Sequence, residues 1–348
     1  MRCVTLEKLT GKETLARAIL SEDYATILPA GAVLKQEYVA KLKELGIEKV
    51  YIEDTDSMAK EVVILQAEME DHVKGKIRDI LERHTYHHNE ELAQLCETAD
   101  NVMSKITEET DVLEQVYDIK ERSADIYEHS LSICTLAILI GLKRKLPQEV
   151  VHDIGVGCLL HDIGLRYLAR SYQNADLSAL SEGDMTEYKK HPVYGYSALK
   201  DESWISDISK SIILYHHERI DGSGYPLHAS KLSEPIQIVN VCDAFDEMIC
   251  GIGCKKVKVH EAIEYLKTFK NIKFNGTIVD VFLQFTAVYP VGTKVLTNEG
   301  EIGTVIRQNK DFPDRPVLRI IVDKSGKEKD ETKDLVKVNH VFIEKVMD

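Results

Sequence analysis

The spacing of apolar residues changes along the chain and separates regions of different predicted structure. From about Arg122 to Tyr289 apolar positions recur at helical spacing, interrupted by loops at 171–184, at 220–226 and around 251–253. From Pro290 onward the period becomes that of β-strands, which are expected at 293–295, 303–306, 317–322 and 334–342. The pattern therefore predicts a helical domain over 121–288 and a small antiparallel β domain over 289–348.

Two other patterns occupy the first 120 residues. Residues 1–57 are predicted to form a small α/β module, with strands at 24–28 and 50–52 and a helix over 36–45. Residues 58–120 contain no proline and one glycine, Gly75, and are rich in Glu, Lys and apolar residues. Long amphipathic helices are expected there, as a spacer or as the dimerisation surface of a homodimer. The predicted fold class is multidomain and mainly α.

Composition and charge narrow the classes of function. The chain is 44% hydrophobic and 29% charged, as in ordinary globular proteins. Its net charge of −14 disfavours a nucleic-acid polymer or an anionic membrane as the main partner, but not a small anionic substrate bound through metal ions. The seven cysteines include no CxxC pair, which is typical of buried thiols in a reducing compartment. Because no apolar run reaches spanning length and the start carries no signal-like core, a cytoplasmic protein without membrane insertion is expected.

An adjacent His–Asp pair ends the short apolar run 157–160. His161 and Asp162, at the end of a buried helix, are poorly placed for packing and well placed to bind a metal ion. The same tetrapeptide, His-Asp-Ile-Gly, begins nine residues earlier at His152. Nine residues turn a helix by about 900°, which is half a turn away from the starting face. Since His152 also follows a helix-start signature, only the pair at 161–162 is expected to face a site.

Further metal-ligand candidates stand on or beside other apolar helical runs. They are His129, His191, His216, His217 and Asp243. An unpartnered carboxylate at Asp243 would be costly to bury, because the preceding residues are mostly apolar. Taken singly, each candidate also has an ordinary explanation as a hydrogen-bonded core histidine or a capping carboxylate. A separate group is expected to be a polar patch on an exposed helix: His84, His87, His88 and Glu90.

Taken together, these residues follow the order H…HD…H…HH…D, which resembles the HD-domain metal-dependent phosphohydrolases. The string from His216 to Pro226, HHERIDGSGYP, narrows the resemblance to the HD-GYP family. The resemblance covers about residues 122–288. It implies an all-α HD-type catalytic domain of the cyclic di-GMP phosphodiesterase type.

The resemblance also implies roles for single residues. It assigns one ion to His129, His161, Asp162 and Asp243, with Asp162 bridging to a second ion held by His191, His216 and His217. Members with a third ion carry a glutamate four residues before the first histidine, and Asp125 is the candidate here. Nitrogen and carboxylate donors suit Fe or Mn. The implied catalytic residues are His161 and Asp162, and the implied substrate contacts are Arg219, Asp221, Tyr225 and Lys255.

The activity that the resemblance implies is hydrolysis of a cyclic dinucleotide, characteristically cyclic di-GMP. The products would be the linear dinucleotide or GMP, and the attacking group a metal-activated hydroxide. The loop Gly224-Tyr225-Pro226 is implied to contact diguanylate cyclase domains.

Two cations that family members use on substrate phosphates are missing. Leu165 stands where the motif usually has lysine, and Ile252–Lys255 replaces an Arg-Pro-Tyr-Arg run, so that Ile252 takes the place of an arginine. Each lost charge-assisted contact is worth about 1.5–3 kcal/mol. Three hypotheses stay open: a cyclic-dinucleotide phosphodiesterase, a degenerate domain that senses a nucleotide or docks a partner, and a phosphohydrolase with a different phosphoester substrate.

Overall fold

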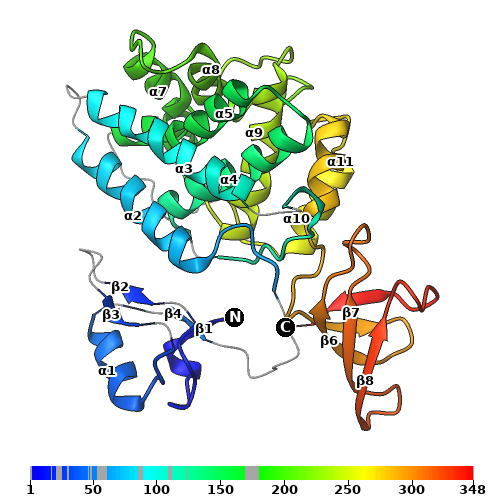
Figure 1. Ribbon diagram of the computed structural model, residues 1–348. Helices are drawn as coiled ribbons and strands as arrows, with labels where there is room; N and C mark the ends of the chain where they lie inside the picture. Colours follow the sequence, from blue (N-terminus) through cyan, green and yellow to red (C-terminus); the bar gives the residue numbers. More distant parts are fainter. Residues whose placement is uncertain are drawn as a thin grey trace. The chain divides into compact units, whose positions relative to one another are not determined.

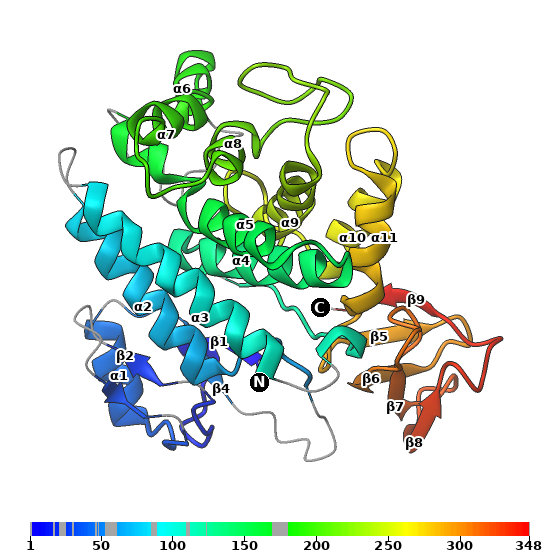
Figure 2. The same cartoon turned by 45° about the horizontal axis from the view of Figure 1, so that its top comes forward.

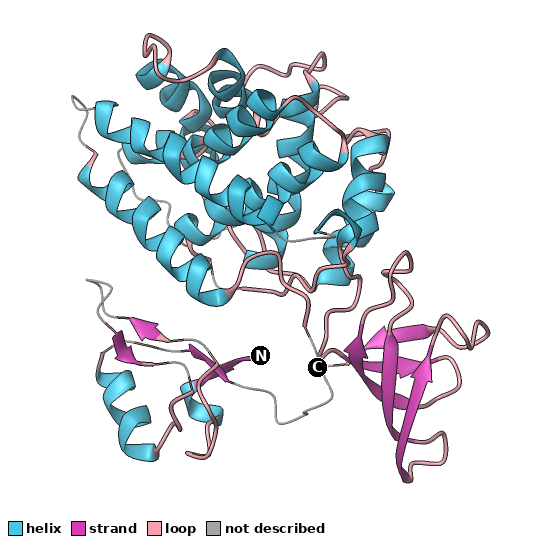
Figure 3. Ribbon diagram, in the orientation of Figure 1, coloured by secondary structure: helices cyan, strands magenta, loops and turns pink. Residues whose placement is uncertain are grey.

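The computed structural model describes the chain except for residues 1, 17, 21–25, 30, 46, 48, 53–60, 85–88, 109–111, 123, 169–179 and 348. The chain divides into two compact units, one of residues 62–288 and one of residues 1–61 with 289–348. Helices build the first unit, and every strand assigned among the described residues belongs to the second (Figure 3). Part of the expected strand 24–28, and both His87 and His88, lie outside the described residues.

The N-terminal module pairs its strands in two short antiparallel ladders. Strand β1 (Arg2–Thr5) pairs with β4 (Lys49–Ile52), and β2 (Ile19–Leu20) pairs with β3 (Thr26–Leu28). Helix α1 (Gln36–Glu44) contributes buried residues to the same apolar core. Residues on one face of the helix thus cover strands whose inward positions are apolar.

The C-terminal module is one five-stranded antiparallel sheet with the order β8-β7-β6-β5-β9. Its strands are β5 (Lys294–Thr297), β6 (Ile302–Arg307), β7 (Val317–Val322), β8 (Glu328–Asp334) and β9 (Ile343–Val346). The core lies on one face, where Val295, Val305 and Leu318 are buried. The predicted small antiparallel β structure is confirmed.

One expected strand in this module is wrong. Residues 334–342 were predicted as a strand, but β8 ends at Asp334 and β9 begins at Ile343. The segment between them turns around Arg315, whose guanidinium donates hydrogen bonds to the carbonyls of Leu335, Val338 and Val341. Strand β8 was missed because its sequence, EKDETKD, has no apolar alternation; as an edge strand it pairs with β7 alone.

The helical unit is built around two central helices, α4 and α5. α4 packs against α5 and α9, and α5 also packs against α3 and α8 (Figures 1 and 2). The helices of the unit are α2 (Ala67–Arg83), α3 (Gln94–Glu108), α4 (Ile126–Lys143), α5 (Gln148–Leu160), α6 (Glu182–Tyr188), α7 (His191–Leu199), α8 (Asp207–Tyr215), α9 (Glu234–Cys250), α10 (Val259–Thr268) and α11 (Gly276–Phe285). The mainly helical class predicted for this region is confirmed.

Helix α4 is apolar on every face because it is the middle of this unit. By length and composition alone it could span a bilayer, yet 67% of that stretch is buried inside the structure. Asp125 ends the preceding loop and accepts hydrogen bonds from the backbone N–H groups of Tyr127 and Glu128, which caps the helix N-terminus. Protein neighbours on all sides account for the apolar composition of α4.

Helices α2 and α3, from the segment expected to be a spacer or dimerisation surface, belong to the same compact unit as α4 and α5. α2 packs against α4, and α3 packs against α5. The buried residues of α3 recur every three or four positions, at Leu95, Ala99, Val102 and Ile106. This spacing places them along one face, which is the face turned toward α5.

Candidate metal centre

Ends of several helices converge on one group of histidines and aspartates. His161 follows the last residue of α5, His216 and His217 follow the last residue of α8, and His191 opens α7. His129 lies in the first turn of α4, and Asp243 in the middle of α9. The C-terminus of a helix carries a partial negative charge, so that the ends of α5 and α8 favour a cation near these histidines.

Three of the histidine rings are held in the same way by the backbone. The Nδ1–H of His161 donates to the carbonyl of Cys158 at 2.7 Å, that of His191 to Tyr188 at 2.9 Å, and that of His216 to Ile213 at 3.0 Å. Each acceptor is a carbonyl three residues earlier, near the end of a helix, where the last carbonyls lack intrahelical partners. A carbonyl can only accept, so Nδ1 carries the proton and Nε2 keeps a free lone pair.

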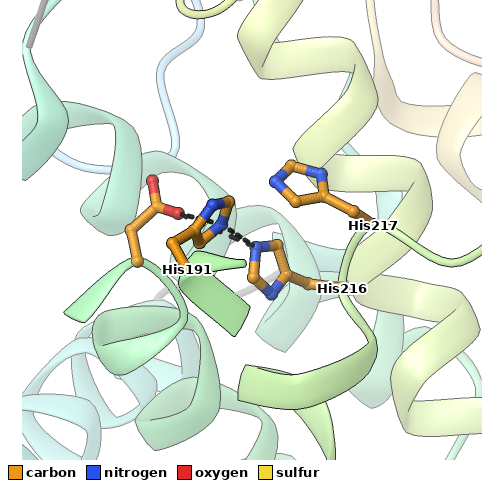
Figure 4. A group of neighbouring side chains, drawn as sticks. His191, His216 and His217 are labelled. Atoms are coloured by element: carbon orange, nitrogen blue, oxygen red, sulfur yellow. Dashed lines mark hydrogen bonds and ion pairs between the residues drawn. The ribbon is translucent and has the colours of Figure 1, made fainter. Parts of the chain in front are cut away.

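These Nε2 atoms surround the carboxylate of Asp162. Asp162 Oδ2 lies 3.2 Å from Nε2 of His161, and Oδ1 lies 3.2 Å from Nε2 of His191 and 3.7 Å from that of His216. The Nε2 atoms of His191 and His216 are 3.1 Å apart, and His217 stands beside them (Figure 4). Two lone pairs at this distance repel each other unless a proton or a metal ion lies between them.

A second set of donors surrounds Asp243, which is fully buried on α9. Its Oδ1 lies 3.3 Å from Nε2 of His129 and 3.9 Å from that of His161, and its Oδ2 lies 3.3 Å from Nδ1 of His217. Three groups have donor atoms within 4.8 Å of one another: Asp162 with His191, His216 and His217; His129 with His161 and Asp243; and His217 with Asp243 and Glu247.

Several of these buried atoms lack the hydrogen bond that burial normally requires. Within the described part of the chain they are His161 Nε2, His217 Nε2, Asp162 Oδ1 and both carboxylate oxygens of Asp243. Leaving such atoms unsatisfied costs about 1–3 kcal/mol each, and more for charged groups. Imidazole nitrogens and carboxylate oxygens are also the donors that divalent transition metals prefer. The residues present therefore fit bound metal ions.

Charges in the cluster favour the protonation states that bind metal. Burial acts to raise the pKa values of Asp162 and Asp243, but adjacent histidines hold both well below the usual range. Burial and neighbouring rings lower the pKa of His216 well below its ordinary value, and burial lowers the pKa of His217 to about 4. At neutral pH the carboxylates are ionised and these two rings neutral, which is the state a metal ion requires.

His129 differs because it lies between two carboxylates. Burial acts to lower its pKa, but the bonds to Asp243 and Asp246 raise the pKa well above its ordinary value. Its Nδ1 lies 2.8 Å from Asp246, which also accepts from Ser132 at 2.7 Å and pairs with Arg122. Asp246 thereby orients the ring so that Nε2 faces Asp243. The sequence analysis missed Asp246, although its place three residues after Asp243 on a predicted helix was a usable signal.

Gly164, the glycine of the second His-Asp-Ile-Gly sequence, allows the segment after Asp162 to lie directly against the start of α7, where His191 stands. A Cβ atom built at this position would lie 1.8 Å from the carbonyl oxygen of His191. Only glycine can therefore bring the short helix after Asp162 against the start of α7. This contact places Asp162 beside the His191 ring.

Other residues expected in the site have different surroundings. Asp125 caps α4 and forms an ion pair with Lys74 at 2.6 Å, outside the three donor groups. Asp221 is exposed and accepts from the backbone N–H of Ser223 at 2.9 Å, which closes a turn. Lys255 is also exposed. These positions show no contact to the cluster among the described residues.

Arg219 and Tyr225 lie closer to the ligands. Arg219 donates to the carbonyls of His216 and Glu218, and its guanidinium lies 5.1 Å from the Phe274 ring centre. The Tyr225 ring stacks on His217 with 4.6 Å between ring centres. Tyr225 thus covers one face of the His217 ring, which belongs to two of the donor groups.

The remaining histidine predictions have mixed outcomes. His152 lies 3.6 Å from Asp100 of α3 and belongs to none of the three donor groups. The exposed patch expected around His84 is wrong for that residue, because His84 is buried and its Nε2 lies 3.1 Å from the hydroxyl of Tyr167. Glu90 is exposed.

A pocket of about 270 Å³ lies beside Asp162. Its lining combines apolar residues with an acid, a base and two hydroxyl groups: Leu81, Ile126, Tyr127, Ser130, Leu159, Asp162, Ile163, Leu165, Arg166 and Leu168. Both Leu165, where a lysine was expected, and the neighbouring Arg166 belong to it. Of the residues in the three donor groups, Asp162 alone contributes to this lining.

Comparison with known proteins agrees with this fold and site. Residues 111–278 match a family model described as HD domain, and residues 294–348 match one described as a KOW domain associated with HD domain. Residues 111–278, which make up just under half of the chain, are therefore similar to the HD-domain family. The resemblance to HD-GYP proteins, which was inferred from residues 216–226, is confirmed by the same match and by the curated relatives.

Curated relatives match more than half of the chain. A cyclic di-GMP phosphodiesterase of Pseudomonas aeruginosa is 28% identical over 220 residues, covering 62% of this chain and 53% of the relative. A cyclic di-GMP phosphodiesterase of Thermotoga maritima is 28% identical, covering 59% and 54%. The chain spans about half the length of these relatives. A solved HDG"Y"P protein from Bdellovibrio bacteriovorus shares the fold, with a TM-score of 0.53 and 20% identity over 81% of this chain and 97% of that one.

Proposed function

We propose that this chain is a metal-dependent phosphodiesterase that hydrolyses a cyclic dinucleotide, with cyclic di-GMP as the first candidate. The observation that carries the proposal is the set of backbone-held histidines whose free Nε2 atoms face buried, unpartnered aspartate oxygens. Relatives that match more than half of the chain are named cyclic di-GMP phosphodiesterases, which supports this substrate class.

Two ions would divide the donors between them. His129, His161 and Asp243 would hold one, and His191, His216 and His217 the other. Asp162 faces His161 through Oδ2 and His191 through Oδ1, which suits a bridging ligand. Bound Fe or Mn ions would supply a hydroxide nucleophile at neutral pH and neutralise charge on the phosphoryl oxygens.

The protein residues around the ions would keep the ligands in place and admit the substrate. The carbonyls of Cys158, Tyr188 and Ile213 would keep the lone pair of His161, His191 and His216 on Nε2, so that these three rings already present it to an ion. The pocket beside Asp162 would receive the phosphodiester. Tyr225, stacked on His217, offers an aromatic face for a nucleobase.

Leu165 and Ile252 bear on the choice of substrate. Both replace cations that HD-GYP members use on phosphates, so binding of the second phosphate is expected to be weaker. Arg166, the residue after Leu165, lines the same pocket and brings a positive charge to it. This arrangement supports a dinucleotide substrate held differently from the family pattern, and it leaves another phosphoester as the alternative substrate. The contact of loop 224–226 with a diguanylate cyclase domain stays a prediction.

The test combines metal analysis with a substrate panel. The chain is purified without oxygen, its Fe and Mn are counted, and it is assayed with cyclic di-GMP, other cyclic dinucleotides and a generic phosphoester. Metal-dependent hydrolysis of a cyclic dinucleotide that is lost in Asp162→Ala is expected. Turnover that persists in Asp162→Ala would contradict the metal mechanism. Tight binding of cyclic di-GMP without turnover in a metal-loaded sample would instead establish a sensor, and turnover of the generic phosphoester alone would establish the alternative substrate class.

A further inference from the structure

One carboxylate beside the cluster has no part in the ligand set described so far. Glu247 lies four residues after Asp243 on α9, one turn along the same helix face. A donor oxygen of Glu247 lies within 4.8 Å of donor atoms of His217 and Asp243. Nothing in the sequence resemblance assigned this position a role.

The neighbours of Glu247 are short of partners. Asp243 is 0% exposed and His217 is 5% exposed, and in the described residues neither oxygen of Asp243 nor Nε2 of His217 has a hydrogen bond. The Glu247 carboxylate itself makes no hydrogen bond or ion pair with any described residue, although it is only half-buried. Unsatisfied atoms of two residues, His217 and Asp243, therefore lie close to a carboxylate oxygen of Glu247.

Two carboxylates one helical turn apart repel each other unless a positive charge lies near them. The charge of Arg219 acts on Glu247, but Arg219 Nη1 donates to two backbone carbonyls and the guanidinium lies over Phe274. A divalent ion between Asp243 and Glu247 would remove the repulsion and satisfy their oxygens together. Imidazole with two carboxylates is a donor set that suits Fe or Mn.

The residue expected to bind a third ion has other partners in this structure. Asp125 accepts two backbone hydrogen bonds at the N-terminus of α4 and pairs with Lys74 at 2.6 Å. Its carboxylate belongs to none of the donor groups. Glu247 is the carboxylate outside the pair of ions that the donor groups do include.

We propose that Glu247 is a metal ligand that, with His217 and Asp243, holds an ion additional to the pair described above. The Asp243 carboxylate has two oxygens and is shared with the first ion. The neutral His217 ring has one lone pair, so that the second ion then keeps Asp162, His191 and His216. The assignment rests on the proposed metal centre but not on its substrate. The additional ligand, Glu247, lies on α9, whereas Asp125 stands at the start of α4. Glu247 thereby takes the function that sequence position had suggested for Asp125.

The experiment counts ions in the full-length chain. Metal is removed from the wild type and from Glu247→Gln, Glu247→Asp, Asp125→Asn and the exposed control Glu149→Gln, and Mn²⁺ is titrated back. Bound Mn²⁺ per chain is measured after equilibrium dialysis, and low-temperature EPR reports spin coupling between neighbouring ions. Thermal unfolding of the metal-free forms shows whether each variant is folded.

Glu247→Gln is expected to bind one Mn²⁺ fewer per chain, or to bind the last ion at least about tenfold more weakly, with altered EPR coupling. Glu247→Asp is expected to recover part of the loss, and Asp125→Asn and Glu149→Gln to bind like the wild type. Equal stoichiometry and affinity in Glu247→Gln and the wild type would overturn the assignment, as would loss of the ion in Asp125→Asn alone.

Activity in the same samples separates this inference from the proposed function. A wild type that binds the additional ion but hydrolyses no cyclic dinucleotide would contradict the proposed activity and support the role of Glu247. If the wild type hydrolyses cyclic di-GMP and Glu247→Gln keeps every ion, the proposed activity is supported and the role of Glu247 is contradicted. A wild type that binds no Mn²⁺ at all would overturn the metal centre and this ligand with it.

Discussion

The tetrapeptide His-Asp-Ile-Gly occurs twice on or beside α5, and the two copies have different surroundings. The copy beginning at His152 lies within the helix, half-buried, with its ring near Asp100 and Asp153. The copy beginning at His161 starts where the helix ends, fully buried, with its ring bonded to the carbonyl of Cys158. In mid-helix that carbonyl would be engaged by a backbone N–H. The end of the helix, rather than the tetrapeptide, leaves the Nε2 of this histidine free to face the donor groups.

Exchanging the histidine of each copy gives the largest expected difference. His161→Gln removes a ligand and should lower phosphodiesterase activity about a thousandfold or more, because charge stabilisation at the phosphate is lost. His152→Gln should stay within about twofold of the wild type, since surface substitutions away from special features are nearly neutral. Steady-state rates and metal content of both variants measure the contrast. Equal losses in the two variants would show that the copies are equivalent.

The glycines of the two copies are expected to differ in stability. Gly164→Ala places a Cβ atom on the backbone of His191 and should destabilise by about 3 kcal/mol or more, because backbone cannot move as a side chain can. At Gly155 the nearest atoms are side-chain carbons of Ala99 and Ile138 at 3.2 Å. Gly155→Ala should change stability by less than about 1 kcal/mol, since helix propensity offsets mild crowding. Urea unfolding of the metal-free proteins compares them, and a more damaging Gly155→Ala would contradict the packing shown.

Asp246 orients His129, one of the proposed ligands, and among the described residues it forms no hydrogen bond or ion pair with the first copy. Asp246→Asn keeps the size of the side chain but weakens its bond to His129 and its pairing with Arg122. Metal affinity should fall by about 10- to 100-fold, the usual effect of losing a residue that orients a ligand. Mn²⁺ titration measures the fall, and Asp153→Asn is the matched control. An unchanged affinity would show that the His129 ring is held by packing alone.

Asp246 also predicts how acid affects the metal-free protein. Burial acts to raise its pKa, but Arg122 and His129 lower the pKa from 3.8 to about 2. A carboxyl with a lowered pKa stabilises the fold above its unfolded pKa and loses that contribution as pH falls through the folded value. The free energy of unfolding should therefore drop by about 2 kcal/mol between pH 4 and pH 2. Asp246→Asn should show a smaller drop, and an equal slope in both proteins would assign acid sensitivity to other groups.

The smallest expected effect concerns the residue after the second copy. Leu165→Lys places a cation in the pocket beside Asp162, next to Arg166. KM for cyclic di-GMP should fall by about tenfold with little change in kcat, because one charge-assisted contact to phosphate is gained in ground state and transition state alike. The matched variant Leu165→Met keeps the size without the charge. A rise in KM would indicate that Arg166 already occupies the phosphate position.

The order of the histidines and aspartates was sufficient to predict which side chains would lie near one another. It could not predict which partners each would find on folding. Asp125 has the right spacing from His129, but the N-terminus of α4 and Lys74 engage it. Asp246 and Glu247 were not predicted as site residues, because a carboxylate on an apolar helix has many ordinary explanations. Strand β8 escaped prediction because an edge strand exposed to solvent needs no apolar face.

The bonds from ring Nδ1 to the carbonyls of Cys158, Tyr188 and Ile213 have a kinetic consequence. Each ring is tied to the last turn of a different helix, α5, α6 or α8. Helix ends open and close far more often than the helices unfold. A bound ion can therefore be released stepwise, one helix end at a time, without unfolding of the central pair α4 and α5. The stability of these terminal turns would then set the rate of metal exchange.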